Sequence, residues 1–126
     1  ISIEAKVMLE MTKKQIIPAV LKYIKEISET ALTKKSLNSN LECYVEEDIV
    51  NNLSSLNFEL YNEVKKLEDS LNEAHELIDL PARSIFYRDS IISKMNKIRK
   101  ISDTLEKNTS KEVWPFPSYS DILFSI

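Results

Sequence analysis

The 126-residue sequence contains no glycine. Average usage of about 7% would give roughly nine. Sheet proteins rely on glycine in hairpin turns and bulges, so its absence argues for helices. It also argues against a Walker loop or a GxGxxG turn, because both need glycine where the backbone approaches phosphate. We therefore expect a single all-α domain over residues 1–126, without nucleotide binding of its own.

Histidine and cysteine are almost as scarce. His75 is the only histidine, which excludes a di-iron site built from two Glu-x-x-His motifs. The stretch HELID, residues 75–79, has Asp79 where a zinc helix motif needs its second histidine, so a half-exposed helix-face histidine is the preferred interpretation. Cys43 is the only cysteine, and we interpret it as a partly buried structural residue in a reducing compartment. No catalytic, cofactor-binding or metal-binding residue is predicted.

Charge of one sign is not in excess, and long apolar runs are missing. The chain has 17 basic and 20 acidic residues, for a net charge of −3, which gives no general attraction to nucleic acid or anionic membranes. No apolar run is long enough for a transmembrane span, and no signal peptide is recognisable. We expect a cytoplasmic protein that binds neither nucleic acid nor membrane. The strongest argument for RNA binding is a basic group in the third helix, but acidic residues interleaved with it weaken the patch. The basic residues are Lys94, Lys97, Arg99 and Lys100.

What is present is helical periodicity. In residues 2–35, apolar side chains recur at three- and four-residue intervals, which indicates one face of a long helix. Its members are Ile3, Val7, Met11, Ile17, Val20, Leu21, Ile24, Ile27 and Ala31. Pro18 removes a backbone donor and clashes with the preceding turn, so we expect a kink or short break near Ile17. Serine and asparagine in residues 34–40 predict the first loop.

A second helix, from residue 42 or 45 to 78, has the most regular pattern. We expect it to supply the core through Leu53, Leu56, Leu60, Leu67 and Leu71. The acidic residues 46–49 suit a helix N-terminus, where the helix dipole stabilises carboxylates. Pro81 suits the first turn of a third helix, which continues to about residue 107 and precedes a loop at 107–112. Three long helices with short connections predict an antiparallel bundle.

The stretch WPFPSYSDILF, residues 114–124, concentrates aromatic residues and proline near the end of the chain. Pro115 and Pro117 hold the backbone extended, and exposing the aromatic side chains together would leave an apolar patch that soluble monomers rarely tolerate. We therefore predict an extended tail at 111–126. Three roles stay open: closing the end of the bundle, contacting another domain or subunit and, least favoured because PFP lacks the PxxP spacing, serving as a short recognition motif. The predicted contact residues are Trp114, Phe116, Tyr119 and Phe124.

Three stretches of the sequence resemble the C-terminal region of type III glutamine synthetases. They are IEAKVMLEM with KKQIIPAV (3–20), ARSIFYRDSIISKM (82–95) and WPFPSYSDILF (114–124), in the same order as in the family. The last is the most specific. Ser118, Ser120 and Ile122 replace the threonine, glycine and leucine of the family pattern, and Ser120 matters most, because a positive φ there would be strained.

The resemblance implies a cytoplasmic enzyme that makes glutamine from glutamate and ammonia with ATP and Mg²⁺, assembled as a homododecamer of stacked hexameric rings. Its catalytic domain precedes this segment, and none of its metal, nucleotide or glutamate contacts can be carried onto positions here. Because the chain begins with Ile1, we expect a segment of a larger protein. The resemblance thus implies a noncatalytic module that contacts the catalytic domain and neighbouring subunits. The alternatives are an independent adaptor that binds partner helices through the heptad seam and, less favoured, a small catalytic bundle.

Overall fold

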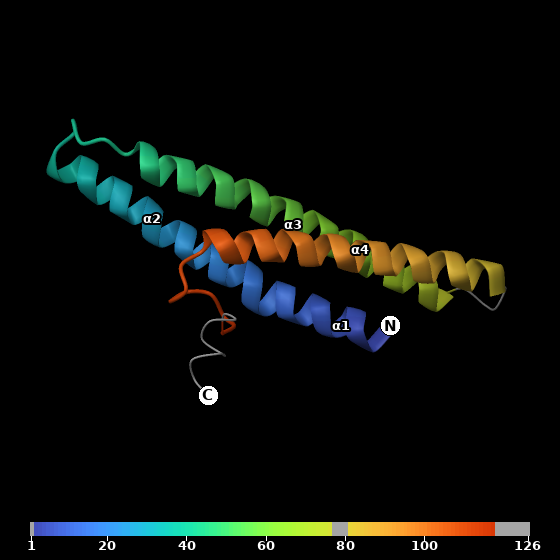
Figure 1. Cartoon of the computed structure of the whole chain (residues 1–126). Coiled ribbons are helices and arrows are strands. Elements are labelled where there is room, and N and C mark those ends of the chain that lie inside the picture. The colour runs from blue at the N-terminus through green and yellow to red at the C-terminus, as the bar shows by residue number, and fades with distance from the viewer. Residues whose placement is uncertain (1, 77–80, 118–126) are drawn as a thin grey trace.

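The computed structural model describes residues 2–76 and 81–117, with side chains described for 3–73 and 85–117. Every element in these residues is helical. They are α1 (Ser2–Met11), the π-helical segment η1 (Thr12–Ile16), α2 (Ile17–Leu37), α3 (Tyr44–Glu76) and α4 (Pro81–Asn108). Figure 1 shows α1, η1 and α2 as one long rod, α3 running back beside it, and α4 lying along the half of the bundle that contains α1. The predicted all-α bundle is confirmed.

The rod passes Pro18 without leaving helical geometry. Pro18 lies in the first turn of α2, and its ring would clash with the carbonyl group of Lys14, four residues earlier. Lys14 belongs to η1, where a π-helical turn holds about one residue more than an α-helical turn and changes the local spacing. The hydroxyl of Thr12 donates a hydrogen bond to the carbonyl oxygen of Met8 at 2.7 Å. A π-helical segment thus stands where a break was expected, and the kink itself stays a prediction.

Helix α3 supplies the centre of the core, as the heptad pattern predicts. Leu53, Leu60, Leu67 and Leu71 are buried, whereas Leu56 is only partly buried at the edge of the same cluster. The helices that face this seam bury Ile91, Met95, Ile98, Ile101 and Leu105 from α4, and Ala5, Ile16 and Val20 from the rod. The seam is therefore enclosed by the helices of this chain.

Helix α1 buries a different face from the one that the apolar pattern indicates. Ile3 is 79% exposed and Val7 is also exposed, whereas Ala5 and Thr12 are buried. Small side chains let neighbouring helices approach closely, and the Thr12 hydroxyl can be buried because it is hydrogen-bonded. The extra residue of η1 also rotates the face of α1 relative to that of α2. The apolar stripe that starts at Ile3 therefore stays largely outside the core.

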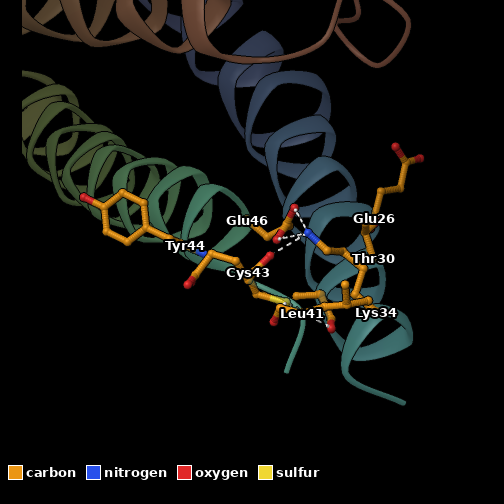
Figure 2. A network of polar contacts seen from close by, with 9 residues as sticks. Glu26, Thr30, Lys34, Leu41, Cys43, Tyr44 and Glu46 are labelled. Carbon is orange, nitrogen blue, oxygen red and sulfur yellow. Dashed lines mark hydrogen bonds and ion pairs between the residues drawn. The ribbon is translucent and has the colours of Figure 1, made fainter. Parts of the chain in front are cut away.

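Lys34 joins α2 to the beginning of α3 (Figure 2). Its Nζ donates to the carbonyl oxygen of Glu42 at 2.7 Å and lies 3.1 Å from Oε1 of Glu46. The hydrogen bond from Lys34 lowers the pKa of the Glu46 carboxyl below its ordinary value, and the positive charge of Lys34 acts in the same direction. Glu46 also lies in the first turn of α3, where the helix dipole favours a carboxylate. The acidic run therefore both starts α3 and fastens it to α2.

Two other ionic contacts tie α3 to its neighbours. Lys13 of η1 pairs with Glu68. Oε1 of Glu63 lies 3.2 Å from Nζ of Lys66 and 3.4 Å from Nζ of Lys97 on α4. The Glu63 side chain is only 6% exposed, and a buried carboxylate is strongly destabilising without a cation. Lys97 therefore links α3 and α4 by neutralising a charge that the packing encloses.

Candidate functional site

An open groove of about 410 Å³ lies between α1 and α4. On each helix the lining residues recur at three- to four-residue intervals, so each helix contributes one face to the groove. The apolar lining consists of Val7, Met8, Met11, Ile16, Met95, Ile98, Trp114 and Phe116. The polar lining consists of Glu4, Thr12, Arg99, Ser102, Asp103 and Glu106. We call this feature the α1–α4 groove.

A turn centred on Ser110 brings the start of the tail to this groove. The carbonyl oxygen of Ser110 accepts hydrogen bonds from the backbone N–H groups of Val113 at 3.1 Å and Trp114 at 3.0 Å. Its hydroxyl oxygen accepts a third from the N–H of Glu112 at 3.3 Å. Trp114 is only 9% exposed and belongs to the core cluster, and Phe116 packs edge-on against it with ring centroids 6.3 Å apart. Polar residues after α4 thus place two aromatic rings at the groove.

The predicted contact residues divide between the described and undescribed parts of the chain. Trp114 and Phe116 lie at the α1–α4 groove, whereas Tyr119 and Phe124 lie outside the described residues, as does Ser120. Trp114 packs against this chain's own helices, which agrees with a tail that closes the bundle. Contact of this strip with another domain or subunit stays a prediction.

The groove wall on α1 escaped sequence reasoning. The apolar spacing predicts that Val7 and Met11 share a helix face with the core residues of α2, yet they are exposed side chains that line the groove. Periodicity reports which residues share a helix face, but it does not report what lies opposite that face. The one available signal is that Ala5 and Thr12, which flank these apolar positions in the sequence, are small enough for close helix packing.

The electrostatics of the groove favour an apolar occupant with little negative charge. Glu4, Asp103 and Glu106 provide three carboxylates against the single cation of Arg99. The mainly apolar lining and the excess of carboxylates over cations therefore suit an apolar protein segment better than an anionic ligand.

The other polar residues considered in the sequence have structural contacts. Cys43 is buried with its Sγ 3.6 Å from the carbonyl oxygen of Ala31. Lys94 donates to Oγ of Ser90 at 2.6 Å. Lys97 is paired with Glu63, so these two members of the basic group on α4 already have contacts within the chain.

His75 lies outside the side chains described. Across the described side chains, no three His, Cys, Asp or Glu residues gather where they could hold a metal ion. Among the described helices, none has an apolar stretch long enough to cross a bilayer.

Comparison with known proteins identifies relatives along the whole chain. A family described as the glutamine synthetase C-terminal domain matches residues 1–35. A type-3 glutamine synthetase from Dictyostelium discoideum is 32% identical over 137 aligned residues, which include 98% of this chain and 17% of that protein. A glutamine synthetase from Butyrivibrio fibrisolvens is 25% identical over 126 residues, with 100% of this chain and 18% of that protein covered. The chain is a relative of the glutamine synthetase C-terminal domain. No solved structure matches it.

The resemblance to glutamine synthetases that the three sequence stretches indicate is thus confirmed. The chain spans less than a fifth of the length of these glutamine synthetases. The family match covers α1, η1 and most of α2, and so includes the wall of the groove formed by Val7 and Met11. The alignment with the Butyrivibrio glutamine synthetase extends over the tail as well.

Proposed function

We propose that the chain is a noncatalytic C-terminal module of a cytoplasmic glutamine synthetase and that it supports the fold and subunit assembly of that enzyme. The parent enzyme ligates ammonia to glutamate with ATP and Mg²⁺, and its catalytic domain lies upstream. The observation that carries this proposal is similarity over the whole chain to glutamine synthetases of which it spans only 17% to 18%.

The use of charged side chains within the bundle supports a noncatalytic role. Lys34 and Glu46 join α2 to α3, and Glu63 is neutralised by Lys66 and Lys97 between α3 and α4. A general acid or base needs a position at a site that substrate can reach. Glu63, the most buried of these carboxylates, is instead enclosed between helices, so its contacts are those of a structural ion pair.

The partners proposed for the module are the catalytic domain and neighbouring subunits of a homododecamer. Besides Phe116 in the tail, Phe86 near the start of α4 is 70% exposed, and Ile85 beside it is also exposed. Phe86 contacts only the edge of Tyr87 among the aromatic rings described, with centroids 5.8 Å apart. Adjacent exposed apolar side chains are typical of contact surfaces, and both belong to one of the stretches that resemble the family.

The adaptor hypothesis receives less support. An adaptor that binds partner helices through its heptad seam needs that seam to be free. Leu53, Leu60 and Leu67 are instead buried inside the chain's own bundle, so a partner helix would have to displace α4 or the rod.

Deletion of residues 113–126 from the full-length enzyme tests the proposal. We expect a lower melting temperature or a smaller oligomeric mass, with ATP and glutamate binding retained by the subunits that stay folded. Phe86→Ser should weaken assembly without lowering the melting temperature of the bundle itself, because the Phe86 side chain is largely exposed. Leu37→Ser changes an exposed apolar residue at the opposite end of the bundle and serves as the control. Unchanged mass, melting temperature and activity in both test variants would contradict a role in assembly. Loss of substrate binding in a fully assembled variant would contradict a noncatalytic role.

A further inference from the structure

We infer that the α1–α4 groove is the seat of the chain's own residues 118–126, with Tyr119 and Phe124 as the aromatic anchors. This inference concerns contacts within one chain and does not rest on the proposed role in glutamine synthetase. It assigns an occupant to an apolar surface that the helices leave open.

The described chain ends at the correct place for this arrangement. Phe116 lines the groove, and the description stops one residue later at Pro117. The nine residues that follow reach about 30 Å when extended. Along α1 and η1, the groove extends from Glu4 to Ile16, a distance of about 18 Å at the helical rise. The tail is therefore long enough to follow the whole groove.

The volume and chemistry of the groove match those of the tail. A cavity of about 150 Å³ accepts a benzene ring, so a groove of about 410 Å³ has room for two aromatic side chains. Five of the nine tail residues are apolar or aromatic, namely Tyr119, Ile122, Leu123, Phe124 and Ile126. The only charged side chain in this stretch is that of Asp121. This charge has the same sign as the excess of carboxylates on the groove rim, so the match depends on the apolar and aromatic side chains and not on charge.

The chain's own tail is favoured over a second copy because it is tethered at the rim. A short tether gives an effective concentration in the millimolar range, which a separate copy does not reach at ordinary protein concentrations. Pro115 and Pro117 also restrict the unbound tail and so reduce the entropy lost when it docks.

Fluorescence of Trp114, the only tryptophan of the chain, tests the inference. Removal of residues 118–126 should shift its emission to longer wavelength, increase its quenching by acrylamide, and lower the melting temperature by about 5 to 10 °C, as expected for two uncovered aromatic anchors. Addition of a peptide with the sequence of residues 118–126 should reverse the spectral changes. Unchanged emission and quenching after truncation would overturn the inference.

A matched pair of variants separates the groove from local shielding of Trp114 by the tail. Val7 and Leu21 are 51% and 55% exposed in the same rod, but only Val7 lines the groove. Val7→Asp should reproduce the spectral effect of truncation and add little to it in the truncated chain. Leu21→Asp should leave Trp114 unchanged. Equal effects of the two substitutions would contradict the inference.

Thiol cross-linking gives a readout that does not depend on tryptophan or on stability. In a Cys43→Ser background, Val7→Cys with Phe124→Cys should be joined within one chain by a short bis-maleimide, whereas Leu21→Cys with Phe124→Cys should not. The same pairs can be examined in the full-length enzyme by peptide mapping. Cross-links between two chains would show exchange of tails between copies, and equal yields for both pairs would place the tail elsewhere, so either result overturns the inference. Because both assays report contacts within one chain, they can fail while the assembly test succeeds, and the converse also holds.

Discussion

Replacing Leu67 by Ala should be among the most destabilising single truncations in the chain. Leu67 is 0% exposed in the middle of α3. The substitution removes the equivalent of three methylene groups, which at about 0.8 kcal/mol each contribute roughly 2.4 kcal/mol of lost transfer free energy. Each 50 Å³ of cavity that does not collapse adds about 1.2 kcal/mol. We expect the free energy of unfolding to fall by about 2 to 5 kcal/mol, and by a similar amount for Leu60→Ala.

Urea unfolding followed by far-ultraviolet circular dichroism measures this loss, with the slope of each transition checked against the unaltered chain. Leu32→Ala is the matched control, because Leu32 is 71% exposed on α2 and a surface change of this kind costs within about 0.5 kcal/mol. If Leu60→Ala and Leu67→Ala were both as mild as the control, the seam would be a surface waiting for a partner. The adaptor hypothesis would then replace the enclosed bundle.

Two predictions concern charged groups. The folded-state pKa of Glu46 is lowered by Lys34, so the stabilisation from this pair is complete above the ordinary glutamate pKa of about 4.3 and is lost as the pH falls through the lower folded value. Unfolding curves between about pH 5 and pH 3 should therefore depend less on pH in Glu46→Gln, and an unchanged dependence would contradict the contact. Replacing Lys66 and Lys97 together by Ala leaves the buried Glu63 carboxylate without either cation and should cost about 3 kcal/mol, more than the sum of the single replacements. If the loss of unfolding free energy in the double variant equalled the sum of the two single losses, Glu63 would have to be neutralised by another group.

The parts of the fold that follow from local sequence were predictable. The leucine spacing of α3 places Leu53, Leu60 and Leu67 on one face. Because α3 has no second apolar face, this face is the one that the core must bury. Pro81 begins α4 as expected, because proline fits the first helical turn. The Ser and Asn residues of the first loop lie close to where α2 ends at Leu37 and Asn38 follows.

The groove was not predictable in the same way. Ile3, Val7 and Met11 have the spacing of a core face, and nothing in that spacing distinguishes a core from an open groove. Whether this face is covered depends on η1, which rotates α1 relative to α2, and on the position of α4. The groove-lining residues of α4 follow those of α1 by more than 80 positions in the sequence. Sequence reasoning found the aromatic end of the site at Trp114 and Phe116 because proline and aromatic residues are unusual beside polar helices, and it missed the aliphatic wall because aliphatic residues are ordinary in them.

Closing the bundle and contacting a partner would use different apolar surfaces of this chain. Trp114 has little area left for a partner, since it is 9% exposed and packs with the core of its own chain. The exposed apolar side chains of Ile85 and Phe86 lie near the start of α4, at the far end of the helix from the Ser110 turn. A helix of 28 residues spans about 42 Å, so these two regions do not form one continuous contact surface. Packing of Trp114 against the bundle and any contact made by Ile85 and Phe86 are therefore expected to respond to separate substitutions, and neither excludes the other.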